Sequence, residues 1–89
     1  MKTKPYTSAM WDADCAALAI LSEAKTAALD AILTRQEATA RWVYKDEPEP
    51  TGPSLYDTLE AWRLVTNAWS RLNQKAFANL LARYELVRD

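Results

Sequence analysis

Apolar positions recur every three or four residues through two long stretches of the chain, which is the spacing of one helix face. Neither stretch contains proline or glycine, and no segment alternates polar and apolar residues as a half-buried strand would. In the second stretch one apolar stripe has only two polar members, Thr66 and Asn73. The stripe consists of Leu55, Leu59, Trp62, Thr66, Trp69, Asn73, Phe77, Leu80, Tyr84 and Val87. The pattern predicts two long helices and an all-α fold.

The residues that break helices gather between the two stretches. The only glycine, Gly52, and three of the four prolines lie there, and a helix cannot continue through closely spaced prolines. We expect a single domain over residues 1–89, with helix one at about 8–46, a proline-rich turn at 47–53 and helix two at about 54–87. The two helices then form an antiparallel hairpin.

Both expected helices carry a capping signal at their start. Thr7 or Ser8 follows a proline at the head of the first helix, and Ser54 stands three residues before Asp57 at the head of the second. Hydroxyl groups at these positions accept hydrogen bonds from the free N–H groups of the first turn.

The first helix differs from the second because it has two apolar stripes. One is bulky and is interrupted by Ser22, Lys25 and Gln36; its members are Trp11, Cys15, Leu18, Leu29, Ile32, Leu33, Ala40 and Val43. The other lies about 140° away at roughly 100° per residue and is mostly alanine: Ala13, Ala17, Ile20, Ala24, Ala28, Ala31, Ala38 and Trp42. A second helix from the same chain can cover only one of these faces.

The uncovered face predicts self-association. We expect two hairpins to form a homodimeric four-helix bundle, because two-fold dimers are the commonest oligomers and a small hairpin lacks a sufficient core. A partner protein or the short N-terminal arm are the alternatives. The expected oligomer interface is the alanine stripe, namely Ala13, Ala17, Ile20, Ala24, Ala28 and Ala31.

Two groups of residues are candidate contacts for another protein. The first is an acidic ridge on the first helix, clear of both apolar stripes: Asp12, Glu23, Asp30 and Glu37. Such a ridge suits a basic partner surface, although acids on a helix surface are more often simply solvated. The second group is the turn-end aromatics Trp42, Tyr44 and Tyr56, which local packing between helix ends would explain nearly as well.

Composition argues against catalysis. The chain has no histidine, and its single cysteine, Cys15, is expected to be a small buried hydrophobe. It also lacks a phosphate-binding glycine loop and a nucleophile elbow. We therefore expect no enzyme activity, no cofactor, and no catalytic or metal site.

Charge and hydropathy narrow the partners and the location. The formal net charge is −1, whereas proteins that hold phosphate backbones usually carry a positive excess, so nucleic acid is a disfavoured partner. The longest apolar run, Cys15 to Leu21, has seven residues, far short of the ~20 that span a bilayer. No membrane association and a cytoplasmic location are expected.

These patterns favour an inhibitor or adaptor that binds another protein. Small acidic helical proteins are common in phages and mobile elements, including anti-CRISPR inhibitors, and size and chemistry place this chain beside them. One alternative is a dimer that binds nucleic acid through basic side chains on helix two: Arg63, Arg71, Lys75 and Arg88. Another is a structural subunit of a larger particle.

Overall fold

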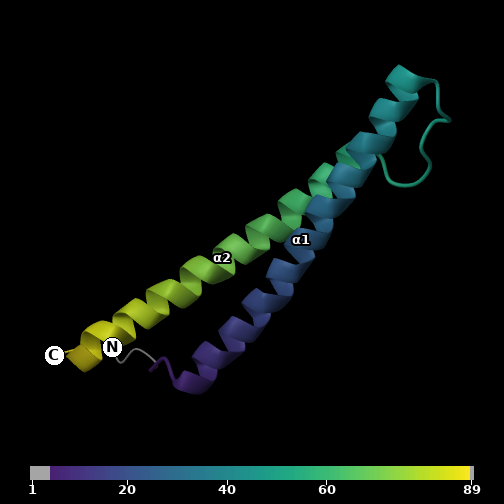
Figure 1. Cartoon of the computed structure of the whole chain (residues 1–89). Helices are drawn as coiled ribbons and strands as arrows, with labels where there is room; N and C mark the ends of the chain where they lie inside the picture. The colour runs from purple at the N-terminus through teal and green to yellow at the C-terminus, as the bar shows by residue number, and fades with distance from the viewer. Residues whose placement is uncertain (1–4, 89) are drawn as a thin grey trace.

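The computed structural model describes residues 5–88, which form two antiparallel helices (Figure 1). Helix α1 spans Ser8–Lys45 and helix α2 spans Leu55–Arg88, and residues 46–54 connect them. Each helix end lies within one residue of the range expected from the sequence. The hairpin is rod-shaped, with principal extents of 66 × 20 × 18 Å. No strand occurs within residues 5–88, so the predicted all-α hairpin is confirmed.

Both helices begin at the predicted caps. Thr7 has extended backbone angles, and its Oγ1 accepts a hydrogen bond from the Met10 N–H at 3.2 Å. At the start of α2, the Asp57 N–H donates to Ser54 Oγ at 3.1 Å and the Ser54 N–H donates to Asp57 Oδ2 at 3.3 Å. This reciprocal pair is a capping box, and it satisfies backbone donors that the first turn leaves free.

The connection is tied back to α1 at both of its ends. Asp46 adopts the left-handed conformation at φ 54° and stops α1, and its N–H donates to the Arg41 carbonyl. Arg41 also forms an ion pair with Glu47 at 2.9 Å. Further along, Arg35 Nη1 donates to the Thr51 carbonyl at 3.1 Å. The turn is therefore held against α1, and it leads directly to the N-terminal cap of α2.

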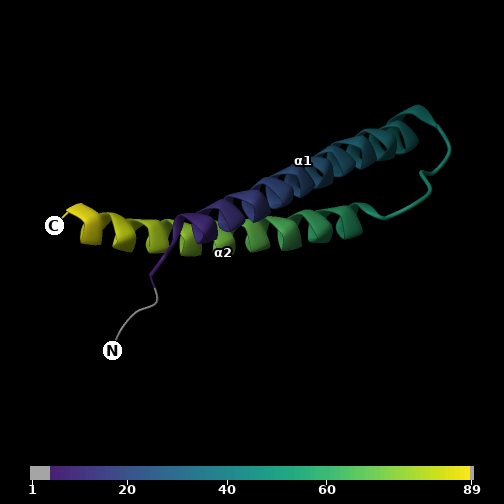
Figure 2. The ribbon, with the colours of Figure 1, turned by 90° about the horizontal axis from the view of Figure 1, so that it is seen from below.

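The two helices meet along a seam of residues spaced alternately three and four apart. This is the spacing of packed antiparallel helices in which one narrow stripe faces the neighbour. On α1 the seam consists of Leu18, Leu21, Lys25, Ala28, Ile32, Arg35 and Thr39, and on α2 of Thr58, Trp62, Val65, Trp69, Leu72, Ala76 and Asn79. The helices cross at a shallow angle, as the two perpendicular views in Figures 1 and 2 show.

The seam buries little. Within residues 5–88 the fully buried apolar side chains are Ile32, 5% exposed, and Ala76, 1% exposed. Thr58 joins them, and its hydroxyl donates to the Leu55 carbonyl at 2.7 Å. Several other seam positions are polar and only half-buried. Two helices alone cannot enclose a core, since each residue in the seam has neighbours on one side only.

Candidate interaction surfaces

The seam on α1 runs between the two apolar stripes and covers neither of them. It takes Leu18 and Ile32 from the bulky stripe and Ala28 from the alanine stripe. The sequence analysis expected α2 to cover no more than one of these faces, and the seam takes residues from both. Continuous 3-4 spacing follows the line on which two rigid helices stay in contact, and that line crosses both stripes.

Six of the bulky side chains that remain uncovered lie on one side of the hairpin. Five of them stand one position after a seam residue, and Tyr84 lies seven residues, or two turns, after Phe77. In an antiparallel pair the positions after the seam point to the same side on both helices. We call this surface the leucine face; its members are Leu29, Leu33, Leu59, Phe77, Leu80 and Tyr84, all exposed. Trp11 and Leu80 line one hollow of about 500 Å³, which also places the two helices' contributions on a common side.

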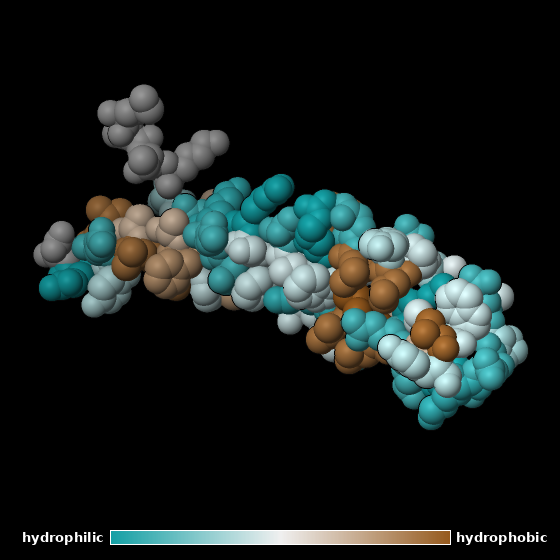
Figure 3. All heavy atoms as spheres, turned by 90° about the horizontal axis from the view of Figure 1, so that it is seen from above, coloured by the Kyte–Doolittle hydropathy of each residue, from teal (hydrophilic) through white to brown (hydrophobic). Residues whose placement is uncertain are grey.

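The stripe on α2 accordingly splits. Its members Leu55, Trp62, Thr66 and Trp69 are half-buried near the seam, whereas the part from Asn73 to Val87 is exposed. On the face seen in Figure 3, apolar residues gather in one group in the turn-side half of the rod and in another near its other end, with polar surface between them.

The alanine stripe faces the opposite side of the hairpin. Ala28 and Ala17 are half-buried beside the seam, while Ala13, Ala24, Ala31 and Ile20 are exposed. The positions preceding the seam on α2 also fall on this side and contribute Leu64. This side is therefore apolar but offers few large side chains. The alanine stripe as an oligomer interface remains a prediction.

The acidic ridge lies on the side of α1 turned away from α2. All four carboxylates, Asp12, Glu23, Asp30 and Glu37, are exposed. Glu23 and Asp30 border a shallow hollow of about 490 Å³ floored by small side chains of α1. Glu37 differs from the others because its carboxylate pairs with Arg41 at 2.9 Å. At the turn end, the ridge carboxylate is therefore already paired within the chain and is less available to a partner protein.

Helix α2 carries the opposite charge along most of its length. Residues 61–84 contain four basic residues and no acidic one: Arg63, Arg71, Lys75 and Arg83. Arg63 holds Glu60 through two hydrogen bonds, of 2.9 Å from Nε and 2.5 Å from Nη2. These bonds lower the pKa of the Glu60 carboxyl and raise that of the Arg63 guanidinium. The middle of α2 is therefore basic, with Arg63 on the side of the positions after the seam and Arg71 and Lys75 on the side of the positions before it.

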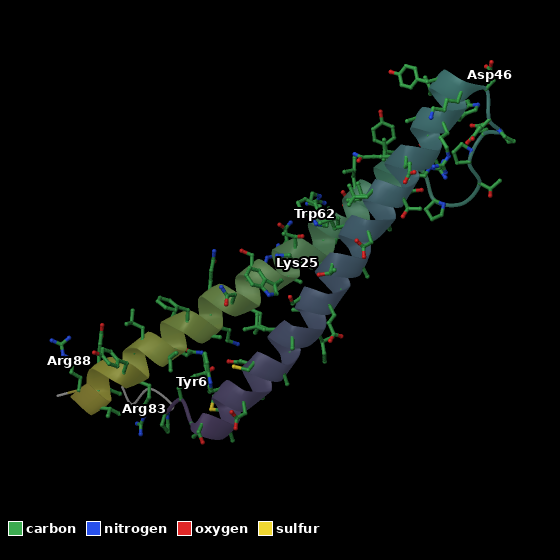
Figure 4. All side chains as sticks on the ribbon, in the orientation of Figure 1. Tyr6, Lys25, Asp46, Trp62, Arg83 and Arg88 are labelled. Atoms are coloured by element: carbon green, nitrogen blue, oxygen red, sulfur yellow. The ribbon has the colours of Figure 1, made fainter. Side chains whose placement is uncertain are left out.

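The turn-end aromatics do not form one cluster. Trp42 and Tyr44 stand two positions apart on α1, which directs them to nearly opposite sides of the helix. Tyr44 is 83% exposed and Tyr56, on α2, is 84% exposed, and Trp42 is also exposed. These side chains surround an acidic turn that carries Asp46 (Figure 4), Glu47 and Glu49. Local packing does not account for the two tyrosines.

Two features of the structure were not predicted from the sequence. The Tyr6 hydroxyl donates to Asp14 Oδ2 at 2.5 Å, which ties the segment before α1 to the helix. Partial desolvation, with this hydrogen bond and the nearby carboxylate charge, raises the pKa of Tyr6 to about 12. Figure 4 shows Tyr6 at the same end of the rod as Arg83, and the two line the hollow that Trp11 and Leu80 share. Pairing a tyrosine with an acid eight residues on has no sequence signature.

The second unforeseen feature is a hollow of about 320 Å³ beneath the turn. Pro50, Pro53 and Thr58 line it together with small residues of α1 and Arg35. Arg35 Nε is buried there and has no hydrogen-bond partner, although the same side chain donates to Thr51 through Nη1.

The described residues contain no cluster of potential metal ligands. Between residues 5 and 88 no group of three or more histidine, cysteine, aspartate or glutamate side chains is placed to hold a metal ion. Cys15 is a half-buried free thiol. In the same part of the chain, neither helix combines the length and hydropathy needed to cross a bilayer. Comparisons with protein-family models, with curated proteins and with solved structures found no match.

Proposed function

We propose that this chain is a small helical interaction protein, an inhibitor or adaptor that acts in the cytoplasm as a homodimer by binding another protein. The observation that carries the proposal is that far more large apolar side chains are exposed than buried. Two apolar side chains are buried in the described residues, whereas sixteen large apolar side chains are exposed. Exposed patches of large apolar side chains on a small protein usually mark places where another macromolecule packs.

The partner we propose has a basic surface. The acidic ridge and the acidic turn supply carboxylates along the outer edge of α1 and at one end of the rod, and Tyr44 and Tyr56 stand free beside that turn. Tyrosine is enriched among the residues that contribute most to binding, because its ring buries a large area while its hydroxyl remains hydrogen-bonded. Complementary charge raises the rate of association and excludes partners of like charge. An inhibitor of phage origin, of the anti-CRISPR type, would fit this chemistry.

The test is affinity capture from extracts of the source cells, compared between charge variants. The double variant Asp30→Lys with Glu37→Lys is expected to lose the captured partner while its helicity, measured by circular dichroism, stays unchanged. The matched control reverses two acids on α2, Glu60→Lys with Glu85→Lys, and is expected to retain the partner. Equal capture by both double variants would remove the acidic ridge from the account.

Nucleic-acid binding is the second candidate. It is favoured because residues 61–84 include basic amino acids and no acidic one. This positive charge is weakened where Arg63 is paired with Glu60 and where Glu85 follows the run. Fluorescence anisotropy with a labelled duplex and a labelled single strand at low salt decides between the candidates. Electrostatic binding would be strongest there and would fade as salt is added. A structural subunit of a larger particle would instead show a mass far above that of a dimer.

A further inference from the structure

We infer that the hollow beneath the turn binds a small organic carboxylate, with the carboxylate group held by Arg35 and the apolar body lying between α1 and the prolines of the turn. This site goes beyond the proposed function, because it takes a small molecule rather than a protein. Its lining includes no residue of the acidic ridge and none of the turn-end aromatics.

The hollow forms where the turn folds back along the end of α1 (Figure 1). Pro50 and Pro53 line it on the side of the turn, and Ala31 and Ala38 line it on the side of α1. Its volume of about 320 Å³ is at the lower end of the range of roughly 300–1,000 Å³ that is usual for small-molecule sites. Such sites have mostly apolar walls and a few polar groups that orient the ligand, and this hollow is built in the same way.

The polar group that orients the ligand is the guanidinium of Arg35. Its Nη1 donates to the Thr51 carbonyl at 3.1 Å, which holds the side chain beneath the turn. Its Nε is buried and has no hydrogen-bond partner. A buried donor without an acceptor is destabilising, and more so on a charged group. An acceptor oxygen supplied by a ligand removes that cost.

The unused edge of this guanidinium has the shape that a carboxylate fits. The N–H groups of Nε and Nη2 lie side by side along that edge, and Nη1, which binds the turn, is not part of it. Arg63 shows the same edge in use, because its Nε and Nη2 donate to the two carboxylate oxygens of Glu60. Two parallel hydrogen bonds combined with opposite charge make a strong and directional contact. The group bound at Arg35 is therefore a carboxylate.

No carboxylate of residues 5–88 pairs with Arg35. The ion pairs in that part of the chain join Arg41 with Glu37 and Glu47, and Arg63 with Glu60. Arg41 thus engages one acid of α1 and one acid of the turn. Among the described residues, the lining of the hollow contains no acidic side chain, so a bound anion meets no like charge on its walls.

The rest of the lining favours an organic acid over a small inorganic anion. Arg35 is the one charged residue among the described residues that line the hollow. Phosphate would leave most of its oxygens against prolines and alanines, where they find no donors. A carboxylate needs a single guanidinium edge, and the apolar body attached to it gains from covering those prolines and alanines.

The site is tested by titrating the isotope-labelled wild-type chain with benzoate at constant ionic strength and following the Arg35 Nε–H signal by NMR. That signal and the Thr51 amide are expected to shift saturably, with a dissociation constant in the millimolar range because the ligand is small. Benzamide has the same ring without the charge and is expected to bind at least roughly tenfold more weakly. Inorganic phosphate has the charge without the ring and is expected to give no saturable shift.

Two leucine variants on α1 separate this site from non-specific binding. Ala31→Leu fills the hollow and leaves Arg35 in place, and it is expected to abolish the shift. Ala24→Leu is the matched control, because both alanines are exposed and each stands one position before a seam residue, but Ala24 does not line the hollow. It is expected to keep the wild-type dissociation constant. Leucine is a good helix former, so both variants retain the hairpin.

A third variant tests the contact with the guanidinium itself. Arg35→Lys keeps the positive charge but loses the paired N–H edge, and it is expected to raise the dissociation constant for benzoate by roughly tenfold or more. The shift of the Thr51 amide reports binding in this variant, and circular dichroism checks its helicity. Unchanged affinity would mean that a point charge is sufficient and would overturn the assignment of the two-pronged contact.

The remaining outcomes are equally decisive. A wild-type chain in which benzoate causes no saturable shift at Arg35 overturns the inference, as does equal binding of benzamide or phosphate. Equal binding of benzoate by Ala31→Leu and the wild-type chain places the ligand outside the hollow and also overturns it. Capture of a protein partner through the acidic ridge is measured separately and does not depend on these results.

Discussion

Lys25 reaches across the seam and places its ammonium nitrogen 4.1 Å from the centroid of the Trp69 ring. In the sequence Lys25 is an interruption of the bulky stripe, yet in the structure it is half-buried and joins the two helices near the middle of the rod (Figure 4). The face of an indole ring attracts a cation, and the lysine stem covers part of the tryptophan while its charge stays near water. A charged residue at the seam is thus compatible with the packing.

The first prediction concerns this contact. Lys25→Gln removes the cation and is expected to lower the free energy of unfolding by about 0.5–1 kcal/mol, the usual contribution of a partly exposed cation–π pair. Urea unfolding at one fixed protein concentration measures the change. Lys25→Arg retains the cation and serves as the control. A glutamine variant as stable as the wild-type protein would show that the contact contributes nothing.

The second prediction concerns the capping box of α2. Ser54→Ala removes the oxygen that accepts from the Asp57 N–H and is expected to cost about 1 kcal/mol of stability, within a usual range of about 0.5–2 kcal/mol. Thermal unfolding followed by circular dichroism provides the measurement. Ser54→Thr keeps a capping hydroxyl and should remain close to wild type. Ser8→Ala, at an exposed serine inside the first turn of α1, should also have little effect, and a loss there equal to that of Ser54→Ala would argue against a specific cap.

The third prediction concerns the pH dependence of Tyr6. Its pKa is raised from 10.0 to about 12, so the neutral phenol is favoured in the folded protein. The stabilisation from the Tyr6–Asp14 contact is therefore complete below about pH 10 and is lost as the pH rises towards 12. The difference between the phenolate absorbance titrations of the wild-type protein and Tyr6→Phe should contain one component with a midpoint near 12.

The same contact supplies its own control. Asp14→Asn removes the negative charge that opposes ionisation of the phenol, and the midpoint of the Tyr6 component should move back towards 10. A Tyr6 component that already titrates near 10 in the wild-type protein would mean that the hydrogen bond to Asp14 is not maintained in solution.

Much of the fold follows from local signals in the sequence. The cluster of prolines with Gly52 ends one helix before the next begins, and the Ser54–Asp57 spacing marks the start of α2, because these effects depend only on neighbouring residues. Helix periodicity likewise indicates which residues share a face. The hairpin is therefore readable without tertiary information.

The sequence does not predict in the same way how each helix is rotated about its own axis, that is, which of its sides faces the other helix. The stripes on α1 are broad, and several lines along it are apolar enough to face α2. The observed line includes Lys25, Arg35 and Thr39, which hydropathy alone would exclude. Their long or hydrogen-bonding side chains make this line acceptable: Lys25 lies on Trp69, and Arg35 binds the Thr51 carbonyl of the turn. The leucine face was missed because its definition depends on that choice of line.

For the same reason, a surface on one helix is easier to predict from the sequence than one that depends on how the two helices pack. The acidic ridge was predicted as a set of residues on one side of a helix, and its four members do lie exposed there. The sides on which the basic residues of α2 lie depend on the rotation of that helix, and their level relative to the ridge depends on the Lys25–Trp69 contact, which exists only in three dimensions.

Unfolding by urea at two protein concentrations tests most directly whether this hairpin depends on a second copy. If an apolar side of the hairpin is covered in a dimer that stabilises the fold, a roughly 100-fold increase in protein concentration adds about 2.7 kcal/mol to the apparent stability and moves the urea midpoint upward. A cooperative transition whose midpoint does not change with concentration would show that the single hairpin is stable with its apolar sides exposed, and would contradict the account.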